Sequence, residues 1–164
     1  MEVRPIDIKD LHGFYALFRE VTAEGKYSAR IEVPPIEAIS RALIQVGEND
    51  WPVYVLDDGG RILGSAEAYP ESFCRAGGDD RIAILGMQIS RDLRRCGHGS
   101  ALLAAVVSHC RHAGFTCIDL TVLKSNTAAR SLYDKFGFVW LEDLPPCKLA
   151  SGMVDQPERM RLVL

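Results

Sequence analysis

The residues with the clearest chemical potential form one glycine-rich segment, Arg94-Arg95-Cys96-Gly97-His98-Gly99-Ser100. It follows an apolar run that predicts a buried strand and precedes apolar residues at helical spacing. A helix N-terminus offers unpaired N–H groups and a positive dipole end, and glycine lets a phosphate approach the backbone. The two arginines would add charge-assisted hydrogen bonds. The segment therefore predicts a pyrophosphate site, against the alternative of a tight turn with solvated arginines.

Two other phosphate-binding motifs fit this segment less well. The nucleoside-triphosphatase loop requires a Gly-Lys-Ser/Thr that is absent. The dinucleotide fingerprint is matched by Gly97 and Gly99, and Asp119 lies near the distance of a ribose-binding acid, but Leu102 replaces the third glycine. Asp119 also falls inside a predicted strand, and too few strands follow it. A dinucleotide-binding module is thus a disfavoured alternative.

The elements around the segment predict one α/β (α+β) domain over residues 1–164, with no repeat and no linker. Hydrophobic periodicity and Gly, Pro and Asp punctuation predict both strands and helices. The expected strands are 3–6, the two arms of a hairpin that turns at 57–60, 81–90, 116–123, 138–144 and 157–164. The expected helices are 10–22, 35–46 ending at Gly47, 99–113 ending at Gly114, and 127–136 capped by Ser125 or Asn126.

Composition excludes several classes of protein. The chain is 48% hydrophobic and 25% charged, with a net charge of -3, which argues against a broad nucleic-acid surface. It has no apolar run long enough for a membrane span and no signal peptide at its start, so neither a nucleic-acid nor a membrane partner is expected. Its five cysteines lack a CxxC pair, which indicates reduced thiols and a cytoplasmic location. His109 and His112 are interpreted as surface residues, and no metal is expected.

The stretch from Ile84 to Phe138 resembles the GNAT superfamily of acetyl-CoA-dependent N-acetyltransferases at three places in the family's order. These are the Gln/Arg-x-x-Gly-x-Gly/Ala signature, a β-strand that leads to Asn, and Ala-x-x-x-Tyr-x-x-x-Gly-Phe. The matching residues are Arg94, Gly97 and Gly99; Ile118, Leu120, Val122 and Asn126; and Ala129, Tyr133, Gly137 and Phe138. The resemblance implies a mixed, mostly antiparallel sheet of six to seven strands with a central splay, flanked by about four helices.

The resemblance also implies the ligand and the residues that hold it. Acetyl-CoA (coenzyme A) is the expected acyl donor, with its pantetheine arm alongside the backbone of Met87, Gln88 and Ile89. The expected pyrophosphate residues are Arg94, Arg95, Gly97, His98, Gly99 and Ser100, with His98 contributing its N–H. Asn126, Ala129 and Tyr133 are expected to complete the cofactor site, although a helix cap alone would explain Asn126.

Tyr133 matches the family's general acid, which protonates the departing thiolate. The alternative is an aromatic side chain that packs between helix and sheet. Some family members carry an acidic residue where this chain has Thr121, so the general base is open. Asp119, about 7 Å along the same strand, and Glu67 on the hairpin are equal candidates, and a water chain is a third possibility.

The expected function is transfer of the acetyl group to a primary amine of a small molecule or amino acid, by direct attack through a tetrahedral intermediate. A backbone N–H near Met87 would stabilise its oxyanion. The alternatives are acetylation of a protein N-terminus or lysine, and a CoA-binding sensor without turnover. Three acidic residues, Glu24, Glu32 and Glu37, cluster with Tyr27 in and after the loop that follows the first helix. If they face the cleft they would favour a cationic amine, and the alternative is a solvated acidic loop. Homodimers are common in the family, so a homodimer is an open expectation.

Overall fold

The computed structural model describes residues 1–28 and 32–164, and a seven-stranded sheet forms its centre. The strand order is β1-β2-β3-β4-β5-β9-β6, and all described neighbours are antiparallel except β4 and β5, which are parallel. The strands are β1 (Glu2–Pro5), β2 (Val53–Asp58), β3 (Arg61–Pro70), β4 (Ile82–Ile89), β5 (Cys117–Leu123), β6 (Val139–Asp143) and β9 (Pro157–Val163).

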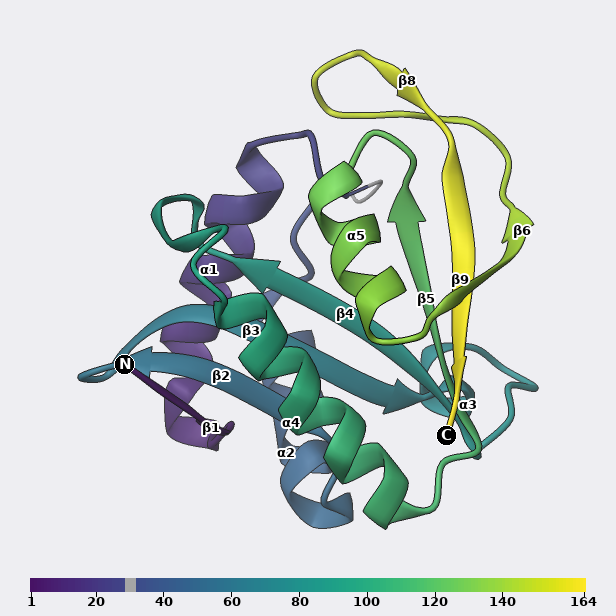
Figure 1. Cartoon of the computed structure of the whole chain (residues 1–164). Helices are drawn as coiled ribbons and strands as arrows, with labels where there is room; N and C mark the ends of the chain where they lie inside the picture. Colours follow the sequence, from purple (N-terminus) through teal and green to yellow (C-terminus); the bar gives the residue numbers. More distant parts are fainter. Residues whose placement is uncertain (29–31) are drawn as a thin grey trace.

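Helices cover both faces of the sheet (Figure 1). α1 (Leu11–Ala23) and α2 (Ile36–Asn49) lie behind it in this view, and α4 (His98–Ala113) and α5 (Thr127–Lys135) lie in front. The main core fills the space under α4 and α5, while smaller apolar clusters lie under α1. The mixed, mostly antiparallel architecture expected from the sequence is confirmed.

The central splay is a fork between β4 and β5. Parallel pairing runs only from Ile82, opposite Cys117, to Leu85, opposite Leu120. Both strands continue beyond these pairs, and Figure 1 shows them diverging into a V. Each strand stays paired on its outer side, because β3 follows β4 to Ile89 and β9 follows β5 to Leu123. The fork therefore opens a recess within an otherwise continuous sheet.

Local details differ from the predicted elements. The second helix passes through Gly47 and ends at Asn49. Asp50, the next residue, adopts the left-handed conformation (φ 52°), and the N–H of Trp51 bonds the carbonyl of Val46. The predicted helix end at Gly47 is wrong. A helix can end at any residue that tolerates the left-handed conformation, and here that residue is Asp50. Five short elements of the described residues were not predicted. They are the 3-10 helices η1 (Ile8–Asp10) and η2 (Arg91–Leu93), α3 (Glu71–Cys74), and the hairpin of β7 (Cys147–Lys148) and β8 (Val154–Asp155).

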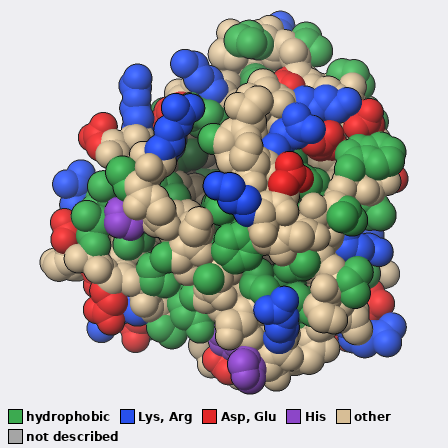
Figure 2. Space-filling model, in the orientation of Figure 1, with side chains coloured by type: hydrophobic (Ala, Val, Ile, Leu, Met, Phe, Trp, Pro, Cys, Tyr) green, Lys and Arg blue, Asp and Glu red, His purple; other side chains and the backbone are tan. Residues whose placement is uncertain are grey.

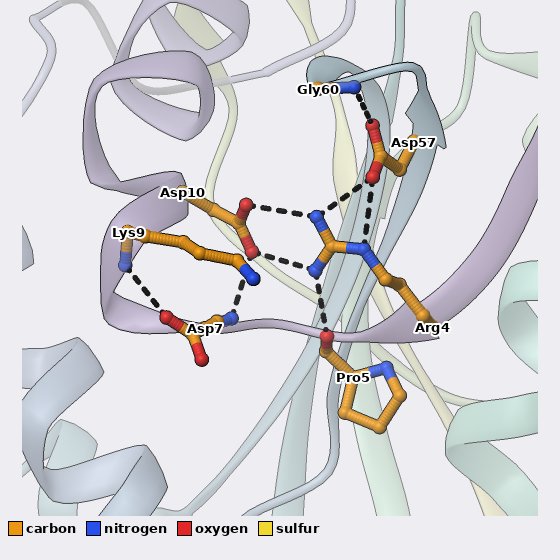
Figure 3. Close-up of polar contacts among 7 residues, drawn as sticks. All are labelled: Arg4, Pro5, Asp7, Lys9, Asp10, Asp57 and Gly60. Carbon is orange, nitrogen blue, oxygen red and sulfur yellow. Dashed lines mark hydrogen bonds and ion pairs between the residues drawn. The ribbon is translucent and has the colours of Figure 1, made fainter.

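Arg4 connects the first strand to the start of α1 (Figure 3). Its guanidinium donates to both carboxylate oxygens of Asp10 at 2.8 and 2.9 Å and to Asp57 on β2. Asp10 also accepts the N–H of Asp7, which closes the capping box of the 3-10 helix Ile8–Asp10 that leads into α1. The hydrogen bond from Arg4 holds the pKa of Asp10 below its ordinary value. This network fixes where α1 begins, and α1 in turn reaches the open end of the fork.

Candidate active site

A cleft of about 810 Å³ occupies the fork. Its floor is β4, and its walls are the end of α1 with the following segment on one side and β5 with α5 on the other. Figure 2 shows Lys and Arg side chains gathered around the upper part of this face, where the surface is hollowed. Residues from these elements line the cleft, among them Val21, Tyr27, Glu67, Met87, Gln88, Ile89, Arg94, Arg95, Gly97, Gly99, Ser100, Asn126, Ala129 and Tyr133.

The start of α4 at one end of the cleft leaves backbone donors exposed. Gly97 is the N-cap with φ 83°, and no side chain caps the helix. Ala101 makes the first helical hydrogen bond, to the Gly97 carbonyl, so the N–H groups of His98, Gly99 and Ser100 precede the ladder. A Cβ on Gly97 would meet no atom within 4 Å, so the approach is open. These features fit a pyrophosphate.

The open edge of β4 presents alternate residues to the fork. The N–H of Ser90 bonds the carbonyl of Leu63 on β3, and alternation along an antiparallel strand turns Met87 and Ile89 the other way, towards the fork. Gln88 by the same alternation directs its backbone towards β3. Its side-chain Nε2 is buried and has no hydrogen-bond partner within the described chain. Of the three residues expected beside the pantetheine arm, Met87 and Ile89 thus turn their backbone groups towards the fork, and Gln88 does not.

Asn126 and Tyr133 lie together on the α5 wall. The Asn126 side chain accepts the N–H of Ala129 at 3.3 Å, so it caps the helix and lines the cleft at once. Tyr133 is 7% exposed, packs on Phe138 and also lines the cleft. Burial, and then the negative charge of Glu67, raise the pKa of Tyr133 above its ordinary value. The phenol therefore holds its proton at neutral pH.

Glu67 lies in the same cleft, on β3 opposite Gly86 of β4. Ser65, fully buried, donates its hydroxyl to Glu67 Oε1 at 2.5 Å. A Cβ placed on Gly86 would lie 2.7 Å from Glu67 Oε2, so the carboxylate occupies the space that a side chain at position 86 would need. Neither Ser65 nor Gly86 was identified from the sequence. Gly86 lies opposite Glu67 only through the pairing of β3 with β4, and Ser65, two residues before Glu67, has no pattern of its own that marks it.

Asp119 is not brought into this cleft. Arg161 on β9 donates to both of its oxygens at 2.6 and 2.8 Å. Asp119 lines a separate pocket of about 210 Å³, which shares Ile84 and Thr121 with the main cleft. Of the two candidate bases, the structure places Glu67 with Tyr133 and pairs Asp119 with an arginine.

The two arginines of the glycine-rich segment have different surroundings. Arg94 donates through both terminal nitrogens to Glu24, at 2.9 and 2.5 Å, and its Nε donates to the Ile89 carbonyl at 3.0 Å. Its guanidinium also lies over the ring of Tyr27, 4.5 Å from the centroid. Arg95 has φ 63°, is exposed, and makes no ion pair with any residue in 1–28 or 32–164.

The histidine pair stays apart from the cleft. Tyr54 and Asp50 contact His109, while His112 bonds the carbonyl of Ser108. No group of three or more His, Cys, Asp or Glu side chains in the described chain is arranged to hold a metal ion. None of its helices combines the length and apolar character needed to cross a membrane.

A forked sheet with an uncapped helix N-terminus at its mouth has the geometry that suits an extended ligand carrying phosphate. The model of the acetyltransferase (GNAT) family matches residues 15–138, and the chain belongs to this family. Acetyltransferase Pat of Mycolicibacterium smegmatis is 29% identical over 113 residues, which are 67% of this chain and 32% of that protein. The chain spans about a third to a half of the length of the curated relatives it matches.

Solved structures show the same fold. Ribosomal-protein-alanine N-acetyltransferase from Brucella melitensis superposes with a TM-score of 0.87 and 20% identity over 100% of both chains. A GNAT superfamily phosphinothricin acetyltransferase from Sinorhizobium meliloti, solved with acetyl-CoA, gives 0.84 at 20% identity over 99% of this chain and 88% of that one. The family model over residues 15–138 confirms the expected superfamily, and these structures share its fold.

Proposed function

We propose that the protein is an N-acetyltransferase that moves the acetyl group of acetyl-CoA to a primary amine of a small molecule or amino acid. The observation that carries the proposal is the joint placement of Glu67 and Tyr133 at the base of a fork whose mouth is an uncapped helix N-terminus. Acetyl-CoA supplies an acyl group activated as a thioester. Family membership and a neighbour solved with acetyl-CoA support this donor.

Donor binding rests on backbone groups. The N–H groups of His98, Gly99 and Ser100 and the charge of Arg95 meet the pyrophosphate, because helix termini and arginines both favour phosphate oxygens. At the open edge of β4, the Met87 carbonyl and the Ile89 N–H pair with the amides of the pantetheine arm, because Arg94 already occupies the Ile89 carbonyl. Asn126 and Ala129 border the arm from the α5 wall.

Catalysis divides among three groups. Glu67 takes the proton of the incoming amine, and Ser65 holds its carboxylate in place. The fork-facing N–H of Met87 donates to the carbonyl oxygen as negative charge develops, a contribution worth about 10²–10³ in rate for such donors. Tyr133 gives its proton to the leaving sulfur, which is consistent with its raised pKa.

The acceptor end of the cleft favours a small amine over a peptide. A peptide groove would run between the segment after α1 and the β7–β8 hairpin. These two parts touch: a Cβ on Gly25 would lie 3.1 Å from both Ala150 Cβ and Ser151 N. Tyr27 narrows the same side of the cleft. This contact supports a compact acceptor.

The test follows thiol release from acetyl-CoA with a panel of small amines, amino acids and peptides, alongside calorimetry with CoA. The expected result is CoA binding and turnover of at least one small amine. Absence of CoA binding refutes the family-based donor, binding without turnover of any amine favours a sensor, and turnover of peptides alone refutes the acceptor class.

A further inference from the structure

We infer that Arg94 is a positioning residue that locks the acceptor wall of the cleft to the pyrophosphate turn, rather than a ligand of the phosphates. The inference rests on the proposed function, because it assigns the two ends of the cleft to donor and acceptor. It reassigns the arginine that the sequence placed among the pyrophosphate residues.

Three of the five N–H groups of Arg94, one on each nitrogen, donate within the protein. Two parallel hydrogen bonds to Glu24 form the bidentate arginine–carboxylate arrangement, which fixes geometry as well as charge. The third donor, Nε, donates a hydrogen bond to the Ile89 carbonyl at the open edge of β4. The face of the guanidinium rests over Tyr27, so this side chain is also held in place. A phosphate would have to compete with the Glu24 carboxylate for this cation.

A second, independent contact joins the same two parts. Glu20 lies one helical turn before Glu24, and its carboxylate accepts the Ser90 hydroxyl at 2.7 Å. Glu20 and Glu24 thus reach the two ends of the short segment Ser90–Arg94 that connects β4 to the glycine-rich turn. The end of α1 is fastened to this segment at both points.

The end of α1 and the residues directly after it form the acceptor wall. Val21, Thr22 and Tyr27 line the cleft, and Gly25 contacts the β7–β8 loop. Arg94 therefore sets the position of the wall that faces the amine. Its charge is balanced by Glu24, whose pKa is lowered mainly by the hydrogen bond from Arg94. Among the described residues that line the cleft, the cation without an ion pair is Arg95, beside the helix N-terminus.

The test compares Glu24→Gln, Arg94→Gln and the double variant, with Arg95→Gln as the matched control one position along the chain. At saturating acetyl-CoA we expect both single variants to raise the acceptor KM by about tenfold with kcat within about threefold. The double variant should be no worse than the worse single one, because both remove one interaction. CoA affinity measured by calorimetry should stay within about twofold in all three. Arg95→Gln should instead weaken CoA about tenfold and leave the acceptor KM unchanged.

The opposite pattern overturns the inference: Arg94→Gln weakens CoA, while Glu24→Gln tightens it by releasing the cation. Additive effects of the two single variants on KM also overturn it. Hydrogen exchange at the amides of residues 25–28 gives a readout that needs neither turnover nor ligand. Equal acceleration in both single variants supports the lock, and unchanged exchange refutes it. Failure of the protein to bind CoA would refute the proposed function and leave this second measurement decisive for Arg94.

Discussion

Gly86→Ala isolates the position of the Glu67 carboxylate from its chemistry. Gly86 has no positive φ, so alanine suits the backbone, and the new methyl group would point at Glu67. The 2.7 Å separation from Oε2 is about 0.7 Å less than the 3.4 Å at which ordinary van der Waals contact begins. The carboxylate must move by roughly that amount or rotate away, which breaks its alignment with the Ser65 hydroxyl.

The expected cost falls on catalysis more than on stability. A misplacement of about 1 Å costs on the order of 10²-fold in rate, so a shift of about 0.7 Å is expected to lower kcat/KM by roughly 10- to 100-fold, or about 1.4–2.7 kcal/mol. The atom that must yield is the end of a flexible side chain, and the melting temperature should therefore change by only a few degrees. Initial-rate assays and thermal unfolding measure both quantities.

The Glu67→Ala background supplies the decisive control. Without the carboxylate the methyl group at position 86 meets no side-chain oxygen, so Gly86→Ala should cost almost nothing further in rate. Gly47→Ala, where no atom lies within 4 Å of the added Cβ, controls for a generic glycine substitution. An equal loss of rate in the presence and absence of Glu67, or a loss below twofold in the wild-type background, would refute the reasoning.

Three further changes test other parts of the structure. Tyr133→Phe should lower kcat by about 10²-fold or more at constant CoA affinity. Because the pKa of Tyr133 is raised, its ionisation should cause no loss of wild-type kcat as the pH rises to 10, and an alkaline decline centred below pH 10 contradicts the assignment. Asp119→Asn should destabilise the protein by about 1–3 kcal/mol in denaturant unfolding, by weakening the pair with Arg161, and leave kcat within about threefold; a 10²-fold loss of kcat would restore Asp119 as the base. Arg4→Met should cost about 2 kcal/mol at pH 7, because Asp10 stays buried without its partner. The lowered pKa of Asp10 means that this stabilisation is present above the unfolded value of about 3.8 and is lost as pH falls through the lower folded value, so the difference between variant and wild type should shrink in acid.

The sequence predicted elements whose signals are local. The turn at Gly97 and the cap at Asn126 follow from short-range chemistry, and both were placed within a residue. The helix end at Asp50 was missed, because an aspartate in the left-handed conformation has no distinctive spacing. The β7–β8 hairpin was missed because each strand has two residues, too few to show periodicity.

The site required information that only strand register supplies. Glu67 and Asp119 were equal candidates along the chain, since each lies on a strand with a suitable polar side chain. Strand pairing gives the two carboxylates different surroundings: Asp119 lies opposite Arg161 on β9, while Glu67 lies opposite Gly86 on β4. Arg94 shows the same limit, because its partner Glu24 lies 70 positions away and no local pattern links the two.

The fork also has a thermodynamic consequence. The two parts of the sheet are joined by the short ladder from Ile82 to Leu85, and beyond it one edge of β4 carries peptide groups that no strand completes. An extended ligand in the recess would satisfy those groups and brace the two parts against each other. Ligand that binds the folded state at 100 times its Kd adds about 2.7 kcal/mol to stability. The resistance of this chain to unfolding would then rise and fall with the supply of its own donor.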